Sequence, residues 1–237
     1  MKKIVLTISA ILPLTLVAAA NANANANANA NANQDIDFSN PVSTYSYANL
    51  GYDSDGFTAG IAASQDFSNG SAMLEYIGAN DFYQHNFIAT LANSNRDAAL
   101  QLDYLWDTDY RDTSKNSRTV FINAINTTSI NSNFSLSPKV GLGLNNNDLS
   151  KNTSYLASAA LTMTYAFNRV VWLDITPEYT YSFNDQKQKV GGKDSYRDSS
   201  IETNLGFKVT PNQFVETTYR YDENNDHYTG IRYNMRF

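Results

Sequence analysis

An alternation of apolar and polar residues runs through most of this chain and constrains its fold more than any other feature. Successive side chains of a β-strand point to opposite faces, so a period of two predicts strands that have one apolar and one polar face. The alternation is strongest in residues 98–106, 134–144, 171–183, 199–209 and 229–237. Weaker alternation predicts further strands near residues 42–52, 57–67, 71–79, 82–92, 118–126, 155–167 and 214–221. No segment shows a helical period, so we expect an all-β protein of about twelve strands.

Strand length and loop pattern indicate that these strands cross a membrane. Each is close to the 9–11 residues that a tilted membrane strand needs. The connections alternate between short turns and longer, charged loops, which is the pattern of outer-membrane barrels. The mean hydropathy of −0.42 does not oppose this, because such a barrel exposes apolar residues only at every second position. The sequence therefore predicts a single transmembrane antiparallel up-and-down β-barrel of about 12 strands, with 10 or 14 as alternative counts and a soluble β-sandwich or lipocalin-like barrel as the competing fold.

Aromatic residues gather at the predicted strand ends, where amphipathic rings of a membrane barrel meet the lipid headgroups. The predicted outer belt consists of Tyr104, Trp106, Tyr179, Tyr181, Phe183, Tyr219 and Tyr221. The predicted inner belt consists of Phe134, Tyr165, Phe167, Phe207, Phe214 and Phe237. Within the strands, Pro138 and Pro177 each remove one ladder hydrogen bond, so we expect these positions to mark local defects such as bulges.

The beginning of the chain reads as an export signal. Lys2 and Lys3 precede a short apolar run, and small residues follow it, which is typical of a secretory signal peptide. We expect residues 1–22 to be the signal peptide, with an uncleaved anchor helix as the alternative. Residues 23–40 begin with an Asn-Ala repeat that has little apolar mass to bury, so we expect a disordered segment. Residues 41–237 then form the barrel, in the bacterial outer membrane and with both termini on the periplasmic side.

The last strand gives the chain a resemblance to a known class of proteins. Residues 228–237 alternate and end in Tyr233, Met235 and Phe237. This ending resembles the assembly signal of the outer-membrane β-barrels of Gram-negative bacteria. The resemblance implies that these three residues are recognised by the barrel-assembly machinery. By size and strand count the chain is most similar to the small KdgM-type porins for acidic oligosaccharides, whose lumen carries basic tracks.

The polar face of the strands carries charges of both signs. The predicted lumen-lining residues are Glu75, Asp103, Lys139, Asp174, Glu178, Glu202, Lys208, Glu216, Arg220, Arg232 and Arg236. One interpretation is a narrow channel whose charges set its selectivity. The other is a set of cross-strand ion pairs that fills the barrel. We therefore expect a porin-like channel for passive diffusion of small hydrophilic solutes, with a non-conducting structural or surface-interaction barrel, for adhesion or membrane integrity, as the alternative.

Composition excludes several other functions. The chain has no cysteine, only two histidines and a net charge of −6. Thiol chemistry and Cys-ligated metals are therefore excluded, and nucleic-acid binding is disfavoured. His85 and His227 have no Ser or Asp at the positions two residues away that share their strand face, so we expect no catalytic residues, no metal site and no cofactor. Residues 53–56 resemble the start of a calcium loop but are better explained by a tight hairpin turn.

The partners that we expect are membrane components and solutes. They are outer-membrane lipid and lipopolysaccharide, the barrel-assembly machinery, and small hydrophilic solutes. No nucleic acid is expected.

Overall fold

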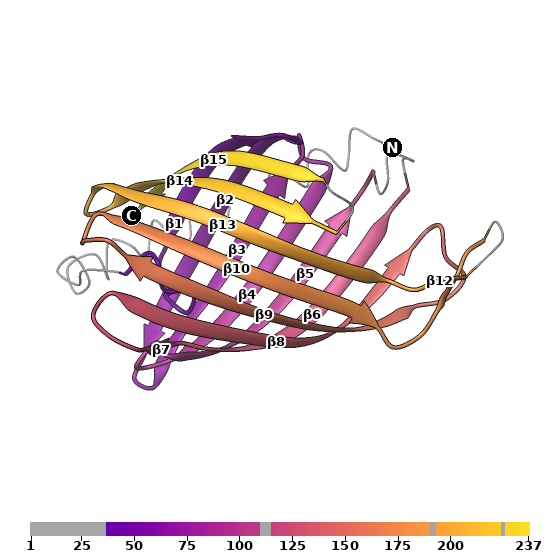
Figure 1. The fold of residues 1–237 in the computed structure, drawn as a ribbon, viewed down its shortest axis with the longest axis horizontal. Helices are drawn as coiled ribbons and strands as arrows, with labels where there is room; N and C mark the ends of the chain where they lie inside the picture. The colour runs from indigo at the N-terminus through magenta and orange to yellow at the C-terminus, as the bar shows by residue number, and fades with distance from the viewer. Residues whose placement is uncertain (1–36, 110–114, 190–192, 224–225) are drawn as a thin grey trace.

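The computed structural model of the chain is a closed barrel of antiparallel strands (Figure 1). It describes residues 37–109, 115–189, 193–223 and 226–237. Within these ranges no helix is long and apolar enough to cross a membrane. The predicted signal peptide, residues 1–22, and most of the predicted disordered segment lie outside the described residues.

Twelve strands form the wall, as the alternation predicted. Their bounds are Tyr47–Asp53 (β1), Gly56–Phe67 (β2), Gly70–Ala79 (β3), Gln84–Asn93 (β4), Ala98–Asp107 (β5), Ser117–Asn126 (β6), Phe134–Asn147 (β8), Ser154–Ala166 (β9), Val171–Ser182 (β10), Arg197–Thr210 (β13), Gln213–Asp222 (β14) and His227–Arg236 (β15). Three two-residue pieces lie in connections: Thr128–Ser129 (β7) pairs with β8, and Gln186–Lys187 (β11) pairs with Lys193–Asp194 (β12).

Each wall strand pairs with its neighbours along the chain, and the first strand closes the ring by pairing with the last. Seven residues of β1 pair with β15, from Tyr47 opposite Arg236 to Asp53 opposite Gly230. Closure leaves no sheet edge, and therefore no row of unpaired backbone groups facing lipid. The strand count and the up-and-down order predicted from the sequence are confirmed.

The two ends of the barrel differ in their connections. One end carries the last residues of β15, the start of β1 and mostly short turns, and we call it the turn end. The other end carries the longer connections between β5 and β6, β8 and β9, and β10 and β13, and we call it the loop end. In Figure 1, β7 lies at the turn end and β12 at the loop end. At the loop end, Asn116 donates hydrogen bonds from its side-chain and backbone nitrogens to the half-buried Asp148, and this lowers the pKa of that carboxyl group.

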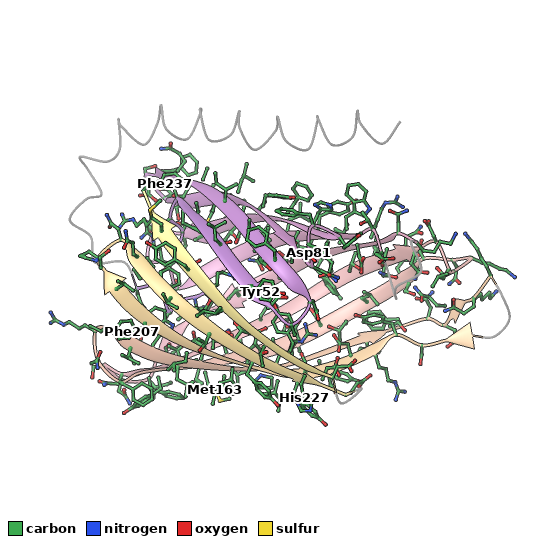
Figure 2. All side chains as sticks on the ribbon, turned by 90° about the horizontal axis from the view of Figure 1, so that it is seen from above. Tyr52, Asp81, Met163, Phe207, His227 and Phe237 are labelled. Atoms are coloured by element: carbon green, nitrogen blue, oxygen red, sulfur yellow. The ribbon has the colours of Figure 1, made fainter. Side chains whose placement is uncertain are left out.

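The outer face of the wall is apolar. In β5, Leu100 and Leu102 are 57% and 46% exposed, whereas Ala99 on the opposite face is buried. The same alternation exposes large apolar side chains around the barrel, including Leu50, Leu74, Leu91, Ile122, Val140, Leu142, Ile201, Leu205 and Ile231. A band of this kind is unfavourable in water and is stable when lipid covers it. Figure 2 shows Phe207 and Phe237 toward the turn end and His227 toward the loop end.

Three local expectations are corrected by the structure. Residues 42–46, the start of the first predicted strand, are not a strand of the wall: β1 begins at Tyr47, and Val42 packs inside the barrel. The reason is a turn before β1, in which Asn40 accepts a hydrogen bond from the backbone of Val42. Phe214, expected in the inner aromatic belt, is 5% exposed and stacks inside the barrel. The ladder is interrupted at both prolines, as expected: β9 does not pair with Thr176 and Pro177, and neither β6 nor β7 pairs with Ser137 and Pro138. Neither proline marks a bulge, because the register is the same on both sides of each, and the register shift occurs between Lys208 and Thr210 instead.

The two faces of β5 predict opposite effects of the same substitution. Leu102→Arg places a charge on the outer face near the middle of the strand and should destabilise the barrel by about 2–4 kcal/mol in lipid. Gln101→Arg, the matched control one residue away, points into the lumen and should unfold at nearly the same urea concentration as the parent. Urea titration of both variants folded into liposomes measures the difference. Equal midpoints for the two variants would contradict the assignment of the faces.

Candidate functional site

The lumen of the barrel contains a polar cavity of about 530 Å³. It extends from residues 38–41, near the turn end, to the loop-end residues of β10 and β13. Its lining comes from most of the wall strands and consists of Phe38, Ser39, Pro41, Asn86, Asp103, Leu105, Thr119, Phe121, Lys139, Thr162, Asp174, Thr176, Glu178, Thr180, Tyr196, Asp198, Ser200, Glu202, Asn204, Glu216 and Arg220. Every second residue of β10 and β13 contributes, because the inward positions of a strand share one face.

The described lining is strongly acidic. It contains six carboxylates, Asp103, Asp174, Glu178, Asp198, Glu202 and Glu216, against two cationic side chains, Lys139 and Arg220. Fixed charges in a narrow lumen act on any ion that passes, because the screening length at 0.1 M salt is about 10 Å. This excess of carboxylates makes the cavity attractive to cations.

Both cationic side chains of the cavity are bound to carboxylates. Lys139 Nζ lies 3.5 Å from Glu178 Oε2, and Arg220 lies 3.4 Å from Asp198. Lys139 and Glu178 are two strands apart and meet over Ala160, whose small side chain on β9 is opposite both residues. The ion pairs neutralise the two cations of the lining and leave four further carboxylates, Asp103, Asp174, Glu202 and Glu216.

Three of these four carboxylates accept hydrogen bonds from neutral groups. Asn123 donates to Asp103 at 2.7 Å, Thr164 to Asp174 at 2.6 Å, and Asn204 to Glu202 at 2.8 Å. The fourth, Glu216, is directly opposite Arg232 in the β14–β15 pairing. Neutral donors hold a carboxylate in place without cancelling its charge, so the acidic character of the lining is retained.

Glycines on the lumen face make room for the larger side chains. A methyl group at Gly141 would collide with Asn123 Oδ1 and would lie 2.7 Å from Ser158 Oγ. Because Gly141 has no side chain, Asn123 can reach Asp103. At Gly206 a methyl group would collide with the indole ring of Trp172, which lies directly opposite on β10. The ring therefore lies flat against the wall, and Trp172 is only 5% exposed.

Seven of the eleven residues predicted to face the lumen line this cavity: Asp103, Lys139, Asp174, Glu178, Glu202, Glu216 and Arg220. The other four lie elsewhere. Glu75 accepts a hydrogen bond from the Tyr47 hydroxyl, and Lys208 Nζ lies 5.1 Å from the centre of the Phe38 ring. Arg232 and Arg236 belong to β15, with Arg236 opposite Tyr47 at the turn end.

The sequence reasoning missed two parts of the lining. Asp198 continues the inward alternation of β13. The strand begins at Arg197, two residues before the predicted run of residues 199–209, so the prediction left Asp198 out. Phe38, Ser39 and Pro41 precede the first strand, and no periodicity marks a segment that folds into a lumen. The predicted balance of charges also changes, because the missed carboxylate lies in the cavity while Lys208, Arg232 and Arg236 do not line it.

Both histidines have tyrosine partners. His85 Nδ1 lies 2.9 Å from the Tyr76 hydroxyl, and His227 Nδ1 lies 2.8 Å from the Tyr219 hydroxyl. Within the described ranges, no three His, Asp or Glu side chains come together in a way that could hold a metal ion. The side chains of Tyr233, Met235 and Phe237 are exposed on the outer face of the last strand. Their role as an assembly signal stays a prediction.

The segment predicted as a calcium loop or a hairpin turn is a hairpin. Asp53 pairs with Gly56 across the β1–β2 turn. The Asp53 carboxylate accepts hydrogen bonds from the backbones of Asp55 and Gly56 and from the hydroxyls of Thr58 and Tyr228. These four donors account for the burial of Asp53.

Comparison with known proteins shows a shared fold without a shared sequence family. No family model and no curated protein matches the chain. Among solved structures, a NanC porin is similar with a TM-score of 0.54 and 11% identity, covering 81% of this chain and 98% of that protein. A KdgM porin in complex with disordered oligogalacturonate has a TM-score of 0.48 and 11% identity over 82% of this chain and 99% of that one. The resemblance to small outer-membrane porins is thus confirmed for the fold.

The contact between Trp172 and Gly206 predicts a spectroscopic change. Gly206→Ala should push the indole ring off the wall and destabilise the barrel by about 1–3 kcal/mol, the usual cost of overpacking. Tryptophan emission reports the movement cleanly in a Trp106→Phe background, because the chain has two tryptophans. Gly230→Ala is the control. Its methyl group would meet Asp53 Cβ at 3.0 Å and no tryptophan atom, so the emission spectrum should not change. An unchanged emission spectrum in Gly206→Ala would show that the ring does not lie against this glycine.

Proposed function

We propose that this protein is an outer-membrane channel through which small hydrophilic solutes diffuse passively, with cations favoured over anions. The observation that carries the proposal is the polar cavity inside a closed wall whose outer face is apolar. An apolar exterior suits lipid, and a polar interior that remains partly unfilled suits water and solutes. The shared fold supports the same function, because the similar NanC structure is that of a porin.

The preference for cations follows from the charges of the cavity. Its carboxylates exceed its cationic side chains, and both cationic side chains are bound in ion pairs. A solute that carries positive charge would find carboxylates along the lumen, and an anionic solute would be repelled. This distinguishes the proposed channel from one built for acidic oligosaccharides.

A second candidate function is a non-conducting structural or surface-interaction barrel. Two observations favour it: ion pairs bridge inward-facing side chains, and Phe38, Ser39 and Pro41, from the segment before β1, line the cavity. Both reduce the space through which a solute can pass. Conductance separates the two candidates, since only a channel produces discrete current steps in a planar bilayer.

We expect the purified protein to insert into planar bilayers and to conduct with a reversal potential that indicates cation selectivity under a salt gradient. Asp103→Arg changes one cavity carboxylate into a cation and should move the reversal potential toward anions while the barrel folds. The control is Asp226→Arg, which makes the same change in net charge at an exposed position of the β14–β15 connection. Folded parent protein that gives no current would support the structural barrel, and equal shifts in the two variants would contradict selectivity set in the cavity.

A further inference from the structure

Residues 37–46, which we call the luminal strap, enter the barrel at the turn end and lie across its interior. Phe38, Ser39 and Pro41 form part of the lining of the cavity, and the chain joins the wall only where β1 begins at Tyr47. The residues of the strap form turns and irregular structure, without strand pairing. Apart from the hydrogen bond that the Phe237 backbone N–H donates to the Ser46 carbonyl, the contacts described below that hold the strap involve side chains, whereas the wall is held by continuous ladders.

The strap contacts opposite sides of the wall. The Phe38 ring stacks on Phe214 of β14 with the ring centroids 4.6 Å apart. Four residues later, Val42 packs against Ala99 of β5 and its neighbours Ala92 and Ile125. Strands β5 and β14 are six strands apart in either direction around the twelve-stranded ring. The strap consequently crosses the full width of the lumen.

The wall has an apolar socket for Val42. Ala92, Ala99 and Ile125 are adjacent in the pairing of β4, β5 and β6, and together they bury Val42 completely. The next inward-facing positions on the same three strands are polar: Thr90, Gln101 and Asn123. Water and ions find no polar partner in this apolar patch, whereas burying the side chain of Val42 there is favourable.

Hydrogen bonds and an aromatic cluster complete the attachment. Asn40 donates to the backbone carbonyl of Arg96 at 3.0 Å and accepts from the Thr127 hydroxyl at 3.2 Å. Thr44 donates to the Ser71 hydroxyl at 2.6 Å. Around Phe38, the ring of Tyr45 packs edge-on at 5.3 Å, and Lys208 Nζ lies 5.1 Å from the ring centre. Few side chains hold the strap, so it is far easier to release than any wall strand.

We propose that the luminal strap is a gate of the channel: it narrows the turn end of the lumen while Val42 occupies its socket, and it opens the lumen when Val42 and Phe38 leave the wall and the strap swings about Tyr47. The inference rests on the proposed channel function and adds its regulation. The gated state is the one in the structure. Release exposes the cavity at both ends.

The experiment compares released and locked straps in planar bilayers. Val42→Asp places an unpaired carboxylate in the apolar socket and should release the strap. A variant lacking residues 37–46 removes it. Both should show about twofold or more the single-channel conductance of the parent, because a peptide crossing a twelve-stranded lumen obstructs much of its cross-section. Ser43→Asp is the control, since it adds the same charge to the strap at a residue that lines neither the socket nor the cavity, and it should conduct like the parent.

The lock uses the absence of cysteine from the chain. Thr44→Cys combined with Ser71→Cys replaces two hydroxyls in direct contact, so a disulfide can form there. Oxidation should abolish transitions to the high-conductance level, and a reductant should restore them. Heat-dependent mobility on gels verifies that each variant forms a folded barrel.

The outcomes separate the gate from the channel. If the parent conducts and Val42→Asp and the variant without residues 37–46 both have the parent's conductance, the strap is no gate and the channel stands. If no folded variant conducts, including the one without the strap, the channel function itself fails. If Val42→Asp does not fold, the truncated variant and the disulfide lock decide the question alone, by the same criteria.

Discussion

The structure depends on the closure of one hydrogen-bonded ladder around the whole wall. In lipid, a backbone N–H or C=O without a partner costs several kcal/mol, so a sheet that crosses a membrane must have no edge. The pairing of β1 with β15 meets this condition with seven residue pairs, as many as β1 forms with β2 on its other side. The apolar exterior and the enclosed cavity both require the pairing of β1 with β15.

Closure also explains why the two faces of the strands carry such different residues. The outer positions need only be apolar, and Leu, Ile, Val and aromatic side chains occupy them. The inner positions face other walls of the same barrel, where polar groups find partners across the lumen or on neighbouring strands. Lys139 and Glu178 show this, since they meet over a strand that separates them. The luminal strap uses the same interior, where Val42 fills an apolar socket formed by Ala92, Ala99 and Ile125.

The sequence predicted the wall well because a period of two is a local property. Leu102 and Asp103 could be assigned to opposite faces from their parity alone, and the boundaries of β5 follow within one residue. The strap could not be predicted, because Val42 and Thr44 continue the same alternation while the chain has already left the wall. Phe214 has the parity of Glu216 and so faces the lumen, although its aromatic ring resembles a belt residue. The acidic excess of the cavity depends on how far along the barrel axis each cationic side chain lies. Parity assigns a side chain to one face of its strand, but it does not give the distance of that side chain from the turn end.

Site-specific labelling along β13 tests the central claim, that one face of each strand meets lipid and the other encloses a polar lumen. Single cysteines at residues 200–205 of the cysteine-free chain can carry a fluorophore, and lipids with a quencher attached to the acyl chain report contact with the bilayer. We predict strong quenching at Ile201, Thr203 and Leu205 and weak quenching at Ser200, Glu202 and Asn204, with a period of two. Quenching that is uniform along these six positions, or strongest at Glu202, would contradict the account.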